Sequence, residues 1–186
     1  SEMMGKLKLY MESGYIERGF KKGISQCSLM FMGNIDVKGE IPIEDFTYVI
    51  PEVMRDPAFI DRIHGFITGW EIPKIGKLDY YISKNYGFVT DYFAEILHEL
   101  RKKTEFYYKV SDNIELSNIT GRDEKAVKKL ASGLLKLLSP HGEIDDKELK
   151  LAIDIAVEYR QRIADWLHFM RPGEYEKKKI GYRVKG

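Results

Sequence analysis

The stretch "TGRDEKAVKKLASGLLKLL", Thr120–Leu138, decides how the second half of this sequence folds. Its apolar residues recur at the i, i+3, i+4, i+7 spacing of an amphipathic helix that buries one face. Thr120 and Asp123 match a capping box, in which two polar side chains satisfy the first free N–H groups of a helix. We therefore expect a helix that begins after Thr120 and packs through one core face. The residues of that face are Val127, Leu130, Ala131, Leu134, Leu135 and Leu138.

Helical patterns continue on both sides of this stretch. Asp145 and Glu148 match a second capping box, for a helix that runs to about Met170. Residues 106–116 fit either an extended piece or a short helix, and the alternating tail fits an edge strand. An earlier helix is also predicted, with one face expected to be core. The residues of that face are Val89, Tyr92, Phe93, Ile96, Leu97 and Leu100.

The first part of the chain consists of shorter patterns. Residues 6–13 predict a short helix closed by Gly14, and residues 15–20 predict a hairpin. The run Gln26–Met32 is apolar enough for a buried parallel strand. Asn34 follows where this strand surfaces, and open α/β sheets bind ligands at that end of their strands. Asn34 is therefore a candidate ligand contact.

Proline and a change of pattern mark the boundaries. Pro51 and Pro57 introduce two short helical pieces, with Pro57 suited to a first helical position. Residues 66–72 alternate enough to be another strand. Long helical patterns then begin, so a domain boundary is expected between about Pro73 and Gly87.

Composition limits the function classes. The 186 residues are 44% hydrophobic and carry a formal charge of +1, which argues against a nucleic-acid or membrane grip by the whole surface. No apolar run approaches the ~20 residues of a membrane span. Cys27 has no mate and lies in the predicted strand, so we expect it to be buried and inert, in a reducing cytoplasm. The opening residues do not resemble a natural start, so we expect a piece of a longer chain. The four histidines lack a mutual metal spacing, and no metal site is predicted; they are His64, His98, His141 and His168.

Four motifs together resemble one family. They are "YMESG" at 10–14, "GNI" at 33–35, "DRIHGF" at 61–66 and "SGLLKLL" at 132–138. Their order resembles the second half of an AAA+ ATPase core, and more specifically the Lon-type ATPases of BREX phage-defence systems, described as ATP-dependent proteases. The resemblance spans Leu7 to about Tyr175.

The resemblance implies an α/β fold that is α+β by content. Residues 1–75 would be the second half of the AAA+ core, a parallel-sheet remnant. Residues 76–172 would be a mostly helical lid subdomain, and residues 173–186 would begin a following region or form an edge strand.

The resemblance also implies roles in ATP hydrolysis. Asn34 matches sensor 1, which orients the attacking water, and an amide suits this task because it both donates and accepts hydrogen bonds. Arg62 matches the arginine finger that a neighbouring subunit supplies in a ring, where a planar cation spreads over the γ-phosphate charge. From the residues alone, Arg62 also fits a local ion pair with Asp61 or Asp56.

Lys128 falls where family members place the sensor 2 arginine, at the start of a lid helix. Lysine keeps the charge but loses the bidentate fork. Arg122, Lys125 or Lys129 are alternatives for this phosphate contact. On helix geometry alone, Lys128 borders the apolar face and equally fits a solvated lysine.

The hairpin resembles the one that points into the central pore of related rings. Tyr15 and Arg18 would contact a threaded polymer there, either DNA or protein. The implied assembly is a homo-oligomeric ring that uses ATP and Mg²⁺ in the cytoplasm.

The sequence also lacks parts that hydrolysis needs. No G-x-x-x-x-G-K-[ST] loop occurs, and Glu12 does not follow the apolar run of a Mg²⁺-binding strand. We therefore expect the isolated chain to be inactive as a hydrolase. Ser132 and Lys136 do not match the protease dyad of the Lon family. The rival interpretations are a nonenzymatic DNA-binding module that uses the basic tail, Lys177–Lys185, and a protein-interaction scaffold built on the helices.

Overall fold

The chain, as a computed structural model, is described over residues 2–38, 41–42, 45, 47–73, 76 and 82–185. About 51% of it is helical, and its strands pair in two-stranded antiparallel sheets, so the expected α+β content is confirmed. The helices are α1 (Glu2–Ser13), η1 (Glu52–Met54), α2 (Pro57–Ile60), η2 (Gly69–Glu71), α4 (Thr90–Lys102), α5 (Glu105–Asn113), α6 (Gly121–Leu138) and α7 (Asp146–Met170). The strands are β1 (Tyr15–Arg18), β2 (Lys21–Ile24), β3 (Val37–Lys38), β4 (Ile41–Pro42), β5 (Ile114–Ser117) and β6 (Gly181–Val184).

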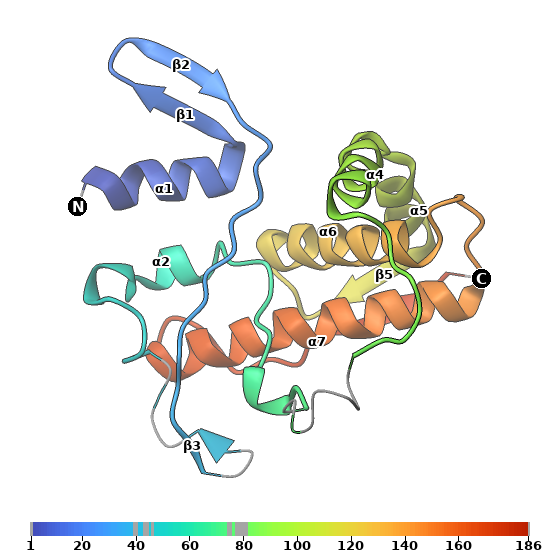
Figure 1. Ribbon diagram of the computed structural model, residues 1–186. Helices are drawn as coiled ribbons and strands as arrows, with labels where there is room; N and C mark the ends of the chain where they lie inside the picture. The colour runs from blue at the N-terminus through green and yellow to red at the C-terminus, as the bar shows by residue number, and fades with distance from the viewer. Residues whose placement is uncertain are drawn as a thin grey trace.

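Helices α6 and α7 lie side by side at the centre of the molecule (Figure 1). Both capping boxes are present, as predicted. The Asp123 amide donates to Thr120 Oγ1 over 3.3 Å, and the Glu148 amide donates to Asp145 Oδ1 over 2.7 Å. Each cap stabilises its helix by about 1 kcal/mol.

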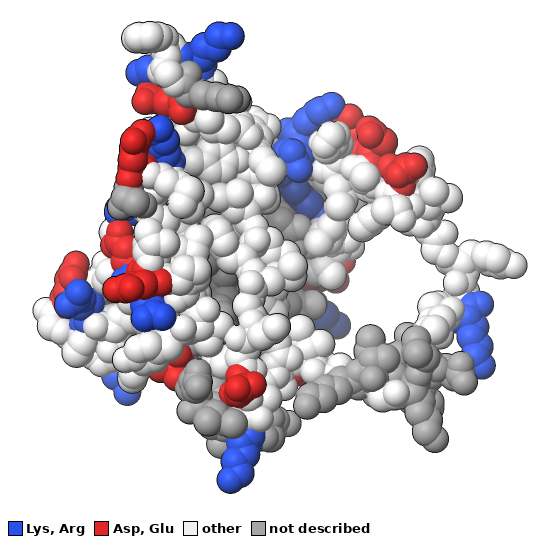
Figure 2. Space-filling view, turned by 60° about the vertical axis from the view of Figure 1, so that its left-hand side comes forward, with Lys and Arg blue, Asp and Glu red and all other residues white. Residues whose placement is uncertain are grey.

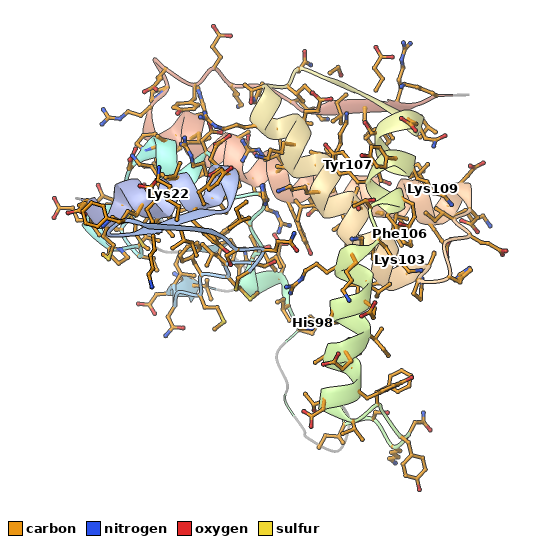
Figure 3. The ribbon with its side chains drawn as sticks, turned by 90° about the horizontal axis from the view of Figure 1, so that it is seen from above. Lys22, His98, Lys103, Phe106, Tyr107 and Lys109 are labelled. Carbon is orange, nitrogen blue, oxygen red and sulfur yellow. The ribbon has the colours of Figure 1, made fainter. Side chains whose placement is uncertain are left out.

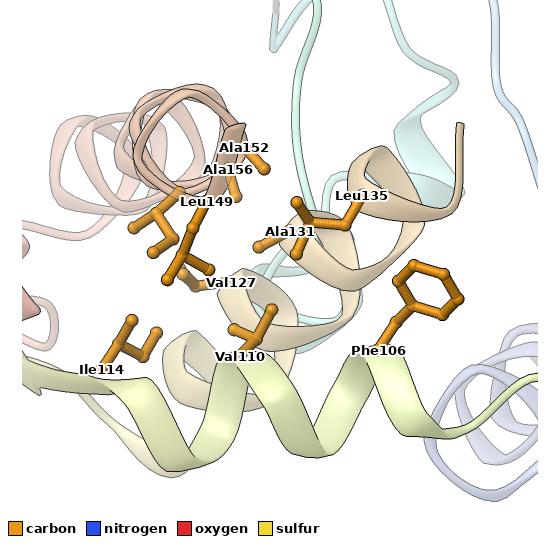
Figure 4. Packing of buried hydrophobic residues seen from close by; sticks show 10 residues of the cluster. Phe106, Val110, Ile114, Val127, Ala131, Leu135, Leu149, Ala152 and Ala156 are labelled. Atoms are coloured by element: carbon orange, nitrogen blue, oxygen red, sulfur yellow. The ribbon is translucent and has the colours of Figure 1, made fainter. Parts of the chain in front are cut away.

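The first hydrophobic core joins α5, α6 and α7. Figure 4 shows Phe106 and Val110 of α5 pointing toward α6, with α7 on the other side of that helix. Val127, Ala131 and Leu135 of the predicted α6 face are fully buried. Full burial of a valine or leucine side chain is worth about 1.5–3 kcal/mol.

Segment 106–116, for which the sequence allowed either a short helix or an extended piece, forms one after the other. Residues 106–113 belong to α5, and β5 begins at Ile114. The tail pairs with it as β6, with Leu116 opposite Tyr182, so the predicted edge strand is confirmed.

A second core lies at the other end of α7. Met4 of α1 and Phe59 and Ile60 of α2 pack against Trp166 and its neighbours on α7. Residues from both sides of the expected domain boundary therefore share one core.

Local signals at α1 and α2 are also confirmed. Gly14 ends α1 with φ 75°, and a Cβ there would lie 2.9 Å from the Ser25 carbonyl oxygen, so glycine is required. The hairpin forms from β1 and β2. Pro57 opens α2, and the side chain of Asp56 accepts from the Ala58 amide over 2.9 Å.

Three predictions for the first half are wrong. Residues 25–36 form no strand; the segment is extended and exposed, with Met30 78% and Met32 90% accessible. Cys27 is consequently exposed rather than buried. Residues 66–72 form a coil and η2 instead of a strand. A strand needs a partner for its N–H and C=O groups, and no described segment of this chain pairs with either of these.

The predicted core face of α4 is also wrong. Leu100 is buried, but Tyr92, Phe93 and Leu97 are 60%, 44% and 37% exposed. Figure 3 shows α4 extending away from the other helices beyond His98. Periodicity identifies the apolar stripe, but it cannot tell whether another element covers it.

No helix in the described part of the chain is long and apolar enough to cross a membrane. Figure 2 views the side that carries α1 and the hairpin. It shows a broad surface without Lys, Arg, Asp or Glu, bordered by charged side chains of both signs.

Candidate functional site

The site is built around a buried arginine of α7 that the sequence analysis did not identify. Arg160 is 1% exposed and donates to Asp61 Oδ1 and to Asp123 Oδ1, each over 2.7 Å. It also donates to the main-chain carbonyls of Asp61 (3.0 Å) and Ile63 (2.7 Å). One guanidinium thus ties α7 to the start of α6 and to the segment that follows α2. A buried arginine is compatible with folding only when paired in this way.

The second carboxylate of this network stays ionised. Burial opposes the charge of Asp123, but hydrogen bonds from Lys178 and Thr120 and the charge of Arg160 outweigh it. The balance lowers the pKa of Asp123 to about 2.

A glycine lets the segment after α2 approach α7 closely. A Cβ on Gly65 would lie 2.8 Å from Cβ of Tyr159, so a larger residue would push the two apart. The Phe66 amide donates to the Tyr159 carbonyl over 3.2 Å. Together with the bonds from Arg160 to the carbonyls of residues 61 and 63, this contact holds the backbone around Arg62 against α7.

Arg62 points from the end of α2 toward α1. Its Nη1 donates to the Ala58 carbonyl over 2.6 Å, and its Nε lies 3.3 Å from Glu12 Oε2. The ion pair of Arg62 is thus with Glu12 and not with Asp61 or Asp56, the two alternatives considered from the sequence. Those two pair with Arg160 and Lys8.

Two cations of α6 approach the same carboxylate. Arg122 Nε lies 3.8 Å from Glu12 Oε2, and its Nη1 donates to Asp61 Oδ2 over 2.7 Å. Lys125 Nζ lies 3.9 Å from Glu12 Oε1 and donates to the Glu12 main-chain carbonyl over 2.9 Å. We call Glu12, Arg62, Arg122 and Lys125 the Glu12 cluster. It joins α1, the end of α2 and α6 through one carboxylate and three cations.

The potential beside the cluster is positive. The pKa of His64 is lowered to about 4, first by burial and then by the charges of Lys129, Arg160 and Lys125. The pKa of Lys129 is also lowered, by burial and then by Lys125. His64 is therefore neutral at physiological pH and adds no charge to these cations.

Lys128 lies on a different side of α6. Its Nζ contacts Glu124 Oε1 over 2.6 Å and Ser111 Oγ of α5 over 3.0 Å. The structure thus brings Arg62 and Arg122 to the same carboxylate. Lys129 lies close enough to His64 and Lys125 for its charge to interact with both. The structure directs Lys128 toward α5.

Asn34 lies exposed on the extended segment that crosses α2 (Figure 1). The neighbouring Phe31 contacts the ring of Phe59 in α2, with 5.6 Å between ring centroids. On the hairpin, Tyr15 is 46% exposed. The side chain of Arg18 lies outside the described residues.

The α+β fold thus gathers Arg122 and Lys125 of α6 beside Arg62, which follows α2. The chain belongs to the family described as the ATPase domain of BrxL-like, Lon-like proteases, whose profile matches residues 1–181. It is 35% identical over 164 residues to the Lon-like protease BrxL of Escherichia coli O9:H4 (strain HS), and 35% identical over 169 residues to that of Bacillus cereus (strain H3081.97). These matches cover 87% of this chain, which spans only 23% and 24% of the two relatives.

Proposed function

We propose that this chain supplies the phosphate-sensing part of an ATP-hydrolysing module in a longer Lon-like protein. Arg62 acts as the arginine finger, Arg122 as the second cation at the phosphates, and Asn34 as the residue that orients the attacking water. ATP and Mg²⁺ bind in the full-length protein. The observation that carries this proposal is the approach of three cations from two elements to the single carboxylate of Glu12.

The chemistry of these cations suits a phosphoryl group. Guanidinium groups donate several hydrogen bonds in one plane and keep their charge at every physiological pH. Phosphoryl transfer spreads negative charge over the equatorial oxygens, and a positioned arginine there accelerates it by about 10³-fold or more.

The second-cation role goes to Arg122 in place of Lys128. Lys128 is paired with Glu124 and turned toward α5, whereas Arg122 faces the same carboxylate as Arg62. Lys129 remains a further candidate. Because Arg62 and Arg122 flank one carboxylate, we propose that they act on the same triphosphate. If Arg62 serves the neighbouring subunit of a ring, Arg122 does too.

The rest of the nucleotide site is proposed to come from other parts of the full-length protein. No G-x-x-x-x-G-K-[ST] loop occurs in this sequence, so the chain alone should not hydrolyse ATP. The exposed apolar segment 25–36 supports this view, since it has the composition of a buried strand. We propose that it pairs within the sheet of the complete module, which would bring Asn34 to the nucleotide. A protein or DNA polymer at Tyr15 and Arg18 is part of the same proposal.

The basic tail is a poorer candidate for a DNA-binding surface. Lys178 is paired with Asp123, and Arg183 with Glu115, so two of its cations already have partners. Steep salt-dependent binding of duplex DNA by this chain would favour the DNA-binding alternative.

The test is the Arg62→Ala variant of the full-length protein. We expect ATP turnover to fall by about 10³-fold, because the developing γ-phosphate charge loses its cation, while ATP affinity changes by only a few fold. Steady-state hydrolysis and equilibrium nucleotide binding measure the two effects. Arg101→Ala, at an exposed arginine of α4, is the matched control and should retain turnover. Unchanged turnover in Arg62→Ala would remove the finger assignment.

A further inference from the structure

Glu12 is an unusual centre for the cluster because its carboxylate does not satisfy the cations around it. The three nitrogen–oxygen distances are 3.3, 3.8 and 3.9 Å, longer than the 2.7–2.9 Å of a charge-assisted hydrogen bond. Arg62 Nε is buried, and although Glu12 Oε2 is the nearest anion, no acceptor lies in its hydrogen-bonding direction. The N–H donors of the cluster thus surround a carboxylate that does not accept hydrogen bonds from all of them.

The charges point the same way. Arg62, Arg122 and Lys125 share the charge of Glu12, and the other nearby carboxylate, Asp61, is divided between Arg160 and Arg122. Burial is the main cause of the low pKa of His64, and the charges of Lys129, Arg160 and Lys125 lower it further. A phosphate group carries more charge than a carboxylate and has more acceptor oxygens, so it would use these donors more completely.

Glu12 can also leave the cluster without unfolding a helix. It is the second-last residue of α1, its side chain is 45% exposed, and the chain reverses at Gly14 two residues later. A change of its rotamer would place the carboxylate in water while α1 stays packed through Met4.

We propose that Glu12 is a carboxylate latch: it occupies the place of a phosphate group among Arg62, Arg122 and Lys125, and a triphosphate must displace it to bind. This inference rests on the proposed function, because it assumes that the same cations receive phosphate. In the latched state Glu12 joins α1 and the end of α2 to α6. In the unlatched state the phosphate takes over the three cations, and the Glu12 side chain no longer links α1 to α6. Phosphate occupancy would thereby be reported to the β1–β2 hairpin, which follows α1 directly.

The test is the binding of inorganic triphosphate to this 186-residue chain, measured by titration calorimetry at constant ionic strength. In Glu12→Gln the competing charge is gone, and we expect the affinity to rise about tenfold. Glu17→Gln is the matched control. Glu17 is similarly exposed (43%) and, among the described side chains, forms one ion pair, with Lys22, so its variant loses the same charge outside the cluster. We expect its affinity to stay within about twofold of wild type.

Two further variants keep the test decisive. Glu12→Asp retains the charge but withdraws it from the cations, so a gain of about threefold is expected even if Glu12→Gln folds poorly. Adding Arg62→Ala to Glu12→Gln should abolish the gain, which separates the cluster from scattered surface lysines.

The outcomes distinguish the latch from the proposed function. Equal affinities for Glu12→Gln, Glu17→Gln and wild type, with loss of binding in Arg62→Ala, would overturn the latch and leave the phosphate site standing. A gain in Glu12→Gln together with normal ATP turnover of the full-length Arg62→Ala variant would support the latch and overturn the finger. If none of the proteins binds triphosphate, the latch is wrong, and the finger assignment is decided separately by the ATP turnover of full-length Arg62→Ala.

Discussion

At the scale of single residues, the site depends on pairings between distant parts of the chain. Arg160 and Asp61 are 99 residues apart, and Arg62 in the turn after α2 meets Glu12 of α1. Arg62 was identifiable because it lies in the motif "DRIHGF", and Arg122 because it is one of the cations near Lys128 at the start of the predicted helix. Glu12 lies in the motif "YMESG", but nothing in the sequence indicated its partners, and Arg160 lies in no motif, since a charged residue in an amphipathic helix is normally solvated. Only the way in which α1, α2, α6 and α7 pack determines which of these charges meet.

His64 gives a prediction at this scale. Burial and the nearby cations lower its pKa from 6.5 to about 4, so the unfolded chain binds the proton at a higher pH than the folded chain. Stability is therefore fully present above pH 6.5 and falls as the pH decreases toward 4, by up to about 3 kcal/mol from this group. Urea unfolding of wild type and His64→Asn, compared across that range, should show a smaller pH-dependent loss in the variant. His98→Asn, exposed on α4, should behave like wild type. The same loss in all three proteins would contradict the assignment.

At the scale of elements, the sequence predicted what is decided locally. Capping boxes, Pro57 at the start of α2, Gly14 after α1 and the hairpin all depend on residues close to one another in the chain, and each of these features is confirmed. The strand over 26–32 and the buried face of α4 depend on whether a partner is present. Within the described residues no strand pairs with 26–32 and most of the α4 face is not covered, which is why composition and periodicity gave wrong predictions for these two elements.

The cap of α6 can be tested directly. Thr120→Ala removes the hydroxyl that accepts from the Asp123 amide, and we expect a loss of about 1 kcal/mol in the free energy of unfolding. Thr90→Ala at the exposed start of α4 is the control and should change stability by less than about 0.5 kcal/mol. Denaturant unfolding followed by circular dichroism measures both. Equal changes in the two variants would show that the capping box does not stabilise α6.

At the scale of the whole molecule, α7 holds the two cores together. Its first half packs against α5 and α6, and its second half packs against α1 and α2. A helix common to two cores couples their unfolding, because either core loses one of its walls when α7 melts.

We therefore expect one unfolding transition for the described structure. Tryptophan fluorescence reports mainly on the second core through Trp166, and far-ultraviolet circular dichroism reports on all helices. The two denaturant midpoints should coincide. A fluorescence transition at clearly lower denaturant would mean that residues 1–75 unfold independently, as the expected domain division allows.

The hydrogen bonds of Arg160 have a mechanical consequence. Its guanidinium holds the peptide carbonyls on either side of Arg62, those of residues 61 and 63. A tilt or rotation of α7 would therefore carry the Arg62 backbone with it as one rigid body. The longest helix among the described residues is in this way a lever arm, and a force applied anywhere along its 25 residues would displace the Arg62 backbone.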